Sequence, residues 1–101
     1  ARRKERAEMT AARMKVLSDP TRVGILLELV RPSHHAATVT ELASQFGLSQ
    51  PTVSVHLKIL REAGLARPER DGNQVRYASD EATVRSFVAA ALDDSLGADT
   101  R

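Results

Sequence analysis

The sequence contains no cysteine and no tryptophan, and its aromatic side chains are limited to Phe46, Tyr77 and Phe87. Without thiols the chain forms no disulfide, holds no metal through thiolates and offers no cysteine nucleophile or thiol redox sensor. Any metal site must therefore use histidine, carboxylate or backbone oxygen ligands. With so few aromatic rings, the core must be built from leucine, valine, isoleucine and alanine.

Long apolar runs are also missing, since no stretch approaches the roughly 20 apolar residues that a membrane span requires. The basic first residues are not followed by the apolar segment of a secretion signal. We therefore expect no membrane partner and a cytoplasmic location. A length of 101 residues fits one small domain with little room for an elaborate catalytic cleft. We assign residues 1–101 to a single domain, with 1–8 and 97–101 as flexible ends.

Charge is unevenly distributed, although the net formal charge is only +2. Residues 1–22 carry seven basic and three acidic side chains, a balance of +4. Residues 49–78 carry five basic and three acidic side chains, +2, whereas residues 79–101 carry two and five, −3. A polyanion would therefore meet the first and middle segments. Solvated helix faces explain the same distribution equally well.

The first part of the chain predicts two helices. The first covers residues 5–17, which contain no strong helix breaker. Asp19 is expected to cap the second helix, because Pro20 then occupies the first helical position, where its missing N–H is not needed. Pro32 ends this helix. Its apolar residues follow a helical spacing and predict one buried face, which consists of Val23, Leu26, Leu27 and Val30.

A short helix followed by a longer one is predicted in the middle of the chain. Thr40 is expected to cap the short helix, and Gly47 is expected to end it. Ser49 is expected to cap the longer helix, which runs to about Ala63. Two helices joined by a tight turn that contains glycine are typical of a helix-turn-helix. The buried face of the longer helix is predicted to consist of Val53, Leu57 and Leu60.

After Gly64 the pattern changes to that of a hairpin. Residues 65–70 and 75–78 flank Asp71-Gly-Asn-Gln74, where the Asp-Gly and Gly-Asn pairs favour the positive φ angles of a tight turn. Pro68 suits only an edge strand. Residues 80–96 then predict a final amphipathic helix. The predicted fold class is mainly α with a small β-hairpin (α+β), a winged helix-turn-helix.

Several segments occur in an order and spacing that is typical of one known family. They are Leu17-Ser-Asp-Pro-Thr-Arg-Val-Gly-Ile-Leu26, Thr40-Glu-Leu-Ala43, Leu48-Ser-Gln-Pro-Thr-Val-Ser-Val-His-Leu-Lys-Ile-Leu60, Arg61-Glu-Ala-Gly-Leu65 and Arg70-Asp-Gly72. Over about residues 10–95 the chain resembles the ArsR/SmtB family of metal-responsive transcriptional regulators. The resemblance implies a homodimer formed through the first and last helices, and release of DNA when an effector, commonly a metal ion, binds. The residues expected at the dimer interface are Met9, Ala12, Val16, Val84, Phe87, Val88 and Ala91.

The resemblance also implies that the helix from Ser49 enters the major groove of double-stranded operator DNA. Gln50 can pair with adenine through N6 and N7. On this helix the expected DNA contacts are Ser49, Gln50, Thr52, Ser54, Val55, His56 and Lys58. In the wing, where phosphates or the minor groove are expected partners, they are Arg67, Arg70, Asn73, Gln74 and Arg76. For each of them, an exposed side chain without a DNA contact is the alternative.

The sequence departs from the family where metal sensing is expected. The family's site on the last helix uses carboxylate and histidine ligands, and here only Glu81 and Asp94 supply oxygen at matching positions. The family's thiolate pair on the short helix falls on residues 43–45, which contain no cysteine. His34 and His35, with a carboxylate, leave open a weak nickel or zinc site. Two solvated histidines, a non-metal effector or a separate co-regulator protein are the alternatives, and no cofactor is assigned.

The predicted function is sequence-specific DNA binding by a dimeric transcriptional regulator on an inverted-repeat operator, as repressor or activator. A protein-interaction module with the same fold would carry acidic or apolar residues on the outer face of helix 49–63. Gln50, Ser54 and Lys58 argue against this alternative. An enzyme has no support, because no nucleophile–base pair, phosphate-binding loop or metal-hydrolase motif is found.

Overall fold

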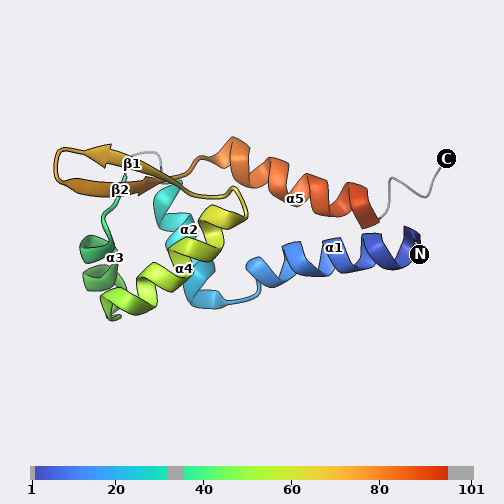
Figure 1. Cartoon of the computed structure of the whole chain (residues 1–101), viewed down its shortest axis with the longest axis horizontal. Coiled ribbons are helices and arrows are strands. Elements are labelled where there is room, and N and C mark those ends of the chain that lie inside the picture. The colour runs from blue at the N-terminus through green and yellow to red at the C-terminus, as the bar shows by residue number, and fades with distance from the viewer. Residues whose placement is uncertain (1, 32–35, 96–101) are drawn as a thin grey trace.

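A computed structural model describes residues 2–31 and 36–95, the last three of them through the backbone alone. The chain forms five helices and one hairpin within these residues (Figure 1). In chain order these are α1 (Arg2–Val16), α2 (Pro20–Leu29), α3 (Val39–Phe46), α4 (Gln50–Glu62), β1 (Arg67–Asp71), β2 (Gln74–Ala78) and α5 (Glu81–Ser95). This order confirms the predicted winged helix-turn-helix.

The molecule is elongated and has two parts. Helices α2, α3 and α4 and the hairpin form one part, which we call the head, while α1 and α5 lie side by side and extend from it as an arm (Figure 1). The principal extents of 49 × 24 × 20 Å reflect this projection. Helix α1 begins at Arg2, three residues earlier than predicted, and so includes most of the segment that we expected to be a flexible end.

The predicted caps of α2 and α4 are confirmed. The Asp19 carboxylate accepts a hydrogen bond from the backbone N–H of Arg22 at 3.0 Å, with Pro20 in the first turn. The Ser49 hydroxyl accepts from the backbone N–H of Thr52 at 3.2 Å. Each side chain satisfies one of the N–H groups that the start of a helix leaves without an intrahelical acceptor.

The predicted cap of α3 is wrong, because the helix begins two residues earlier than expected. Thr38, and not Thr40, is the N-cap, and its hydroxyl accepts from the backbone N–H of Glu41 at 3.1 Å. The Glu41 carboxylate accepts in return from the backbone N–H of Thr38 at 2.9 Å. This reciprocal pair is a capping box, which requires threonine and glutamate three residues apart. Thr38 and Glu41 have that spacing, whereas Thr40 and Glu41 do not.

The turn between α3 and α4 depends on Gly47. This residue ends α3 in the left-handed conformation, with φ 63° and ψ 38°. An added Cβ would meet no atom within 4 Å, so the backbone angle and not a lack of space favours glycine here. The Leu48 N–H donates to the Ala43 carbonyl at 2.9 Å and closes the end of α3. The turn thereby fixes where α4 starts.

The hairpin has a two-residue loop, since Asp71 pairs with Gln74 in its register. Gly72, which belongs to both the Asp-Gly and the Gly-Asn pair, has the positive φ that we expected in the turn, 62°, and Asn73 does not. A positive φ at the first loop residue alone is the pattern of a type II′ turn. Pro68 lies opposite Tyr77. Tyr77 also exchanges hydrogen bonds of 2.8 and 3.0 Å with the backbone of Ala37, which joins the wing to the segment before α3.

The core lies in the head, and its fully buried large side chains are Ile25, Leu26, Leu29, Leu42, Val53, Leu57, Leu60 and Leu65. The buried face predicted for α4 is confirmed, but the face predicted for α2 is only partly right. Leu27 is 57% exposed, while Arg22, Ile25 and Leu29 are buried. The residues at positions 22, 25, 26 and 29 also follow a helical spacing. We did not predict this buried face because Arg22 is charged, and we therefore did not count it among the buried residues. No helix within the described residues is long and apolar enough for a membrane crossing.

Candidate nucleic-acid interface

Helix α4 presents an outer face of mostly polar side chains. We call this face the reading ridge, and it consists of Gln50, Thr52, Ser54, Val55 and Lys58, all of which are exposed. The opposite face of α4 is anchored in the core through Val53, Leu57 and Leu60. Because one face is fixed, the other is presented in a defined orientation, as a base-reading helix requires.

The start of α4 is more occupied than we expected. Besides accepting from the Thr52 amide, the Ser49 hydroxyl lies 2.8 Å from the Thr52 hydroxyl. The Val53 amide donates to the Ser49 carbonyl, and Pro51 has no amide hydrogen. Ser49 therefore acts first as a cap, and the helix start offers few free N–H groups for a phosphate.

His56 does not lie on the reading ridge, although we predicted it among the DNA contacts. Three residues along a helix correspond to a rotation of about 60° from Val53, so position 56 lies at the border between core and surface. The side chain is half-buried, and its Nδ1 lies 3.3 Å from a guanidinium nitrogen of Arg22. The contact that the structure shows for the His56 ring is therefore with another residue of the protein, Arg22.

The wing is exposed along β1, in its turn and at the start of β2. Of its predicted DNA contacts, Arg70, Asn73 and Gln74 lie at this exposed end. Arg70 makes no hydrogen bond or ion pair within the described chain. Arg67 is already engaged, with guanidinium nitrogens 3.3 Å from the carboxylates of both Glu69 and Asp80. Arg70 is therefore better placed than Arg67 to offer an unshared charge to a phosphate.

Arg76 connects the wing to α3. Its guanidinium lies 3.1 Å from the Glu41 carboxylate, 3.0 Å from that of Asp71 and 3.4 Å from the Ala36 carbonyl. The hydrogen bond from the Thr38 amide, and then the charge of Arg76, hold the pKa of Glu41 below its ordinary value. We predicted that Arg76 contacts DNA, but in the structure it fastens the hairpin to the helix-turn-helix.

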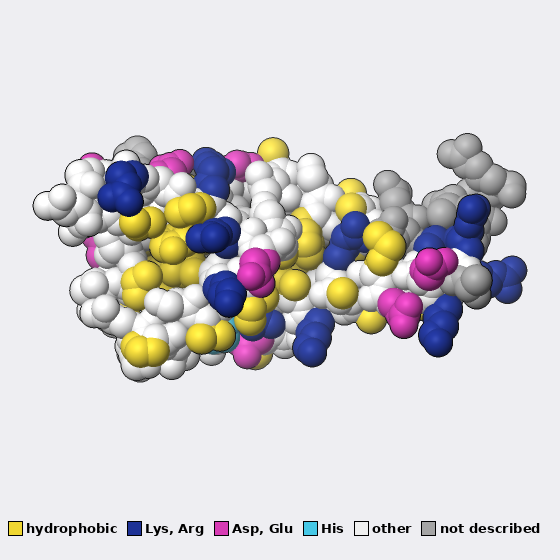
Figure 2. All heavy atoms as spheres, in the orientation of Figure 1, with side chains coloured by type: hydrophobic (Ala, Val, Ile, Leu, Met, Phe, Trp, Pro, Cys, Tyr) yellow, Lys and Arg dark blue, Asp and Glu magenta, His cyan; other side chains and the backbone are white. Residues whose placement is uncertain are grey.

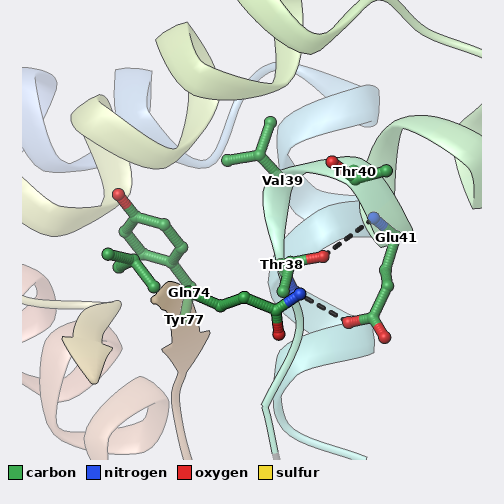
Figure 3. A pocket seen from close by; sticks show the side chains of 7 residues that line it. Thr38, Val39, Thr40, Glu41, Gln74 and Tyr77 are labelled. Carbon is green, nitrogen blue, oxygen red and sulfur yellow. Dashed lines mark hydrogen bonds between the residues drawn. The ribbon is translucent and has the colours of Figure 1, made fainter. Parts of the chain in front are cut away.

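An open hollow of about 460 Å³ separates the start of α3 from β2 (Figure 3). Its lining mixes polar and apolar side chains, and consists of Thr38, Val39, Thr40, Glu41, Gln74, Val75 and Tyr77. Figure 2 shows apolar side chains gathered on this face between α3 and the hairpin, with basic side chains around them. The Glu41 carboxylate lines this hollow, and its negative charge would repel a phosphate, so the hollow does not suit a phosphate group.

The arm carries the apolar side chains that a second subunit could cover. None of the described residues of α1 is buried. Met9, Met14, Val88 and Leu92 are between 42% and 53% exposed. Beside them lies a mainly apolar hollow of about 180 Å³, lined by Arg13, Met14, Leu17, Phe87, Val88, Ala91 and Leu92.

The residues that we predicted at the dimer interface differ in how exposed they are within a single chain. Ala91 is only 5% exposed within a single chain, so it packs inside the subunit. Val16, Val84 and Phe87 are half-buried against the core, whereas Ala12 is exposed as expected. Met14 and Leu92 are exposed apolar side chains of the arm that our prediction did not include. Met14 lies about 140° around α1 from Met9, outside the single apolar stripe that we followed.

A metal centre is not formed by the side chains that the structure describes, since no three histidines or carboxylates gather there. Glu81, which we proposed as a ligand, lies 2.7 Å from Arg85 and is engaged in an ion pair. His34, His35 and the side chain of Asp94 lie outside the described residues. The described part of α5 therefore does not fit the metal site that the family resemblance implies.

Comparison with known proteins identifies relatives that support this geometry. The model of the family described as bacterial regulatory protein, arsR family, matches residues 19–67. The probable mercury resistance operon repressor of Streptomyces lividans is 37% identical over 84 residues, 83% of this chain and 65% of that protein. The crystal structure of NolR from Sinorhizobium fredii has a TM-score of 0.71 at 32% identity, covering 93% of this chain and 90% of that one.

A third relative is a domain that was solved in solution. It is the homodimeric winged helix-turn-helix DNA-binding domain of a possible ArsR-family transcriptional regulator from Mycobacterium bovis. Its TM-score is 0.68 at 26% identity, with 94% of this chain and 88% of that chain covered. The family consists of transcriptional regulators, which confirms that the chain is not an enzyme. The segment from the cap of α2 to the start of β1 matches the family model, the whole fold matches NolR, and the chain belongs to the arsR family of bacterial regulatory proteins.

Proposed function

We propose that this protein represses transcription by binding an inverted-repeat operator as a homodimer, with α4 in the major groove and the wing on the adjacent DNA. The observation that carries the proposal is the reading ridge. Its side chains are exposed on a helix whose opposite face is fixed by Val53, Leu57 and Leu60. A ridge without this anchoring could not present the same atoms to each base pair.

The ridge has the chemistry needed to distinguish base pairs. The Gln50 amide can donate to N7 and accept from N6 of adenine in a bidentate pair. Val55 can contact a thymine methyl group, and the Ser54 hydroxyl can donate or accept. Lys58 adds a positive charge for a phosphate, which contributes affinity without sequence information.

In the wing, Arg70 is the side chain that we assign to the phosphate backbone, with Asn73 and Gln74 beside it. Arg67 and Arg76 are held by carboxylates, so their contribution is to hold the wing in place. With Arg70 as the arginine of the wing that is free within the described residues, the affinity should fall with rising salt concentration, but less steeply than three free wing arginines would give.

The arm supports the dimer. A helix of 15 residues with none buried needs a partner surface, and Met9, Met14, Val88 and Leu92 provide an apolar one. The related domain from Mycobacterium bovis is homodimeric. A two-fold dimer presents two copies of α4 in inverted orientation, which matches the symmetry of an inverted repeat.

Repression is proposed from the relatives. The Streptomyces lividans protein is a probable repressor of a mercury resistance operon. The Xylella fastidiosa relative, at 36% identity over 86 residues, is a biofilm growth-associated repressor. A dimer bound at a promoter represses because it occupies DNA that the transcription machinery needs.

Substitution of Gln50 by alanine tests the reading ridge. The operator is first selected from random DNA by the wild-type protein, and affinities for operator and random DNA are then measured by fluorescence anisotropy. Because each lost adenine pair removes roughly 1–3 kcal/mol of discrimination, we expect operator preference to fall at least about 10-fold. Gln45→Ala, the same change at an exposed position of α3, is the control. Unchanged discrimination by Gln50→Ala would reject the proposed reading surface.

A further inference from the structure

Arg22 is a buried charged side chain that joins three helices. It lies in the first turn of α2, is 8% exposed and belongs to the buried face of that helix. Its Nε donates to the Val16 carbonyl at 2.7 Å, and one Nη donates to the Lys15 carbonyl at 3.0 Å. The other Nη lies 3.3 Å from Nδ1 of His56 on α4. One guanidinium thus contacts the end of α1 and the DNA-reading helix together.

The contacts with α1 have a physical reason. The last carbonyls of a helix lack intrahelical donors, and the dipole of the helix places partial negative charge at this end. Lys15 and Val16 are the last two residues of α1. The guanidinium donates to both carbonyls, of which that of Lys15 also accepts from the amide and the hydroxyl of Ser18. The dipole favours its positive charge, which offsets the burial of that charge. The nearby Asp19 carboxylate adds a negative charge on the α2 side of Arg22.

The contact with His56 identifies the ring nitrogen that accepts a hydrogen bond. A guanidinium has only donors and keeps its proton in proteins, so the ring nitrogen facing it must be the acceptor. Nδ1 of His56 therefore carries no proton, and the proton of the neutral ring resides on Nε2.

We propose that Arg22 is a positioning residue for DNA reading: it orients His56 with Nδ1 as the hydrogen-bond acceptor and fixes the angle of α4 to the dimer arm. The inference rests on the proposed function and adds to it the device that sets the distance between the two reading helices. Helix α1 packs mainly against α5, and α4 packs against α2 and α3, so direct packing between α1 and α4 is sparse. The Arg22 guanidinium supplies polar contacts across that junction.

The consequence is a preference for operator spacing. In a dimer the two α4 helices are related through the arms, so any rotation of α4 against α1 changes their separation. Adding one base pair between half-sites moves them apart by about 3.4 Å and rotates one around the duplex by about 34°. A head fixed to its arm tolerates this change poorly, whereas a head with a loosened junction adapts to it.

The protonation state is tested on the wild-type protein in the absence of DNA. Long-range ¹H–¹⁵N correlation spectra at pH 7.5 distinguish the two neutral forms of histidine from the cation. His56→Asn identifies the His56 signals among the three imidazoles of the chain. We expect an unprotonated Nδ1 and a protonated Nε2. A proton on Nδ1 would overturn the proposal, and this measurement requires no substitution of Arg22.

Spacing selectivity is tested with His56 variants and Arg22→Lys. His56→Asn keeps an acceptor near the position of Nδ1, whereas His56→Leu has none. On the selected operator and on copies lengthened or shortened by one base pair, we expect wild type and His56→Asn to lose about 10-fold in affinity. We expect His56→Leu and Arg22→Lys to lose roughly threefold or less, since a lysine ammonium lacks the planar fork of donors.

The ratio between spacings is the quantity to compare, because any direct contact of His56 with DNA cancels in it. If His56→Leu discriminates between spacings as strongly as wild type, the positioning role of Arg22 is wrong. Failure of the proposed function is distinguishable, since the wild-type protein would then select no inverted repeat from random DNA. Circular dichroism melting curves establish that each compared variant is folded.

Discussion

The head and the arm differ in how far a single chain buries their apolar side chains. In the head, most large apolar side chains of α2, α3 and α4 meet in one core and are almost completely buried, with Leu27 and Val55 as exposed exceptions. In the arm, α1 buries none of its described residues, and four large apolar side chains of α1 and α5 are about half exposed. The head is thus complete within one chain, whereas the arm is complete only when another surface covers it.

This difference separates stability from assembly. A change in the head should alter the free energy of unfolding of each chain, while a change on the arm should alter the association of two chains. Leu27 serves as a control for both kinds of change. It is a large apolar residue of the head that is 57% exposed, so it belongs neither to the core of the head nor to the exposed apolar side chains of the arm.

The largest effect is expected in the core of the head. Leu57→Ala should lower the free energy of unfolding by about 2–5 kcal/mol, because it removes a buried side chain and leaves a cavity. Urea denaturation followed by circular dichroism measures the change. Leu27→Ala, the same substitution at an exposed position, should stay within roughly 0.5 kcal/mol of wild type. Equal losses for both variants would contradict the contrast between the two sites.

The next effect is expected on the arm. Val88→Glu places a charge on the exposed apolar face of α5, and in a symmetric dimer it does so twice. We expect the dimer dissociation constant to rise about 10- to 100-fold, equivalent to roughly 1.4–2.8 kcal/mol. Analytical ultracentrifugation measures it, with Leu27→Glu as the control. A Val88→Glu dimer as stable as wild type would place the interface elsewhere.

A smaller effect is expected at the junction of α3 and the wing. Thr38→Ala should destabilise the protein by about 1 kcal/mol through loss of the cap, while Thr40→Ala should change little.

The pKa of Glu41 is lowered in the fold by the Thr38 amide and then by Arg76, so its carboxylate stabilises the folded state at pH values above its ordinary pKa. This stabilisation is lost as the pH falls below about 4. Glu41→Gln should flatten that dependence in denaturation measured between pH 3 and pH 6.

The smallest effect concerns metal binding through His34 and His35. Calorimetric titration with nickel and zinc should show at most weak binding, because imidazoles without thiolates are the ligands that remain. His34→Ala and His35→Ala should each remove that heat. Identical binding by wild type and both variants would exclude these two histidines as metal ligands. It would leave a non-metal effector or a co-regulator protein as the proposals for sensing.

The fold could be predicted from the sequence because local signals coincide with the global pattern. Asp19-Pro20, Gly47, Ser49 and Gly64 mark element ends with a stereochemical reason for each, and the spacing of Val53, Leu57 and Leu60 defines the buried face of α4. The cap of α3 was misplaced by two residues because two threonines precede Glu41. Only Thr38 lies three residues before Glu41, the spacing at which the glutamate side chain can accept from the backbone N–H of the capping threonine.

The site was harder to predict because a charged side chain can either pair with another residue of the protein or remain exposed for a contact with DNA. Arg76 and Arg70 look alike in the sequence, but a carboxylate on α3, 35 positions from Arg76, engages one and not the other. Arg22 and His56 are separated by 34 positions, so their contact has no local signal. Long-range pairing of this kind decides which arginines remain available to DNA.

The bridge between Ala37 and Tyr77 has a consequence for the order of folding. These two residues exchange both backbone hydrogen bonds although 40 positions separate them. Closing so long a loop is entropically unfavourable until the intervening helices have condensed. We therefore expect the hairpin to attach last, and the amide hydrogens of Ala37 and Tyr77 to exchange with solvent through opening of this bridge before the head unfolds as a whole. Their exchange rates would then report how firmly the wing is attached to the rest of the head.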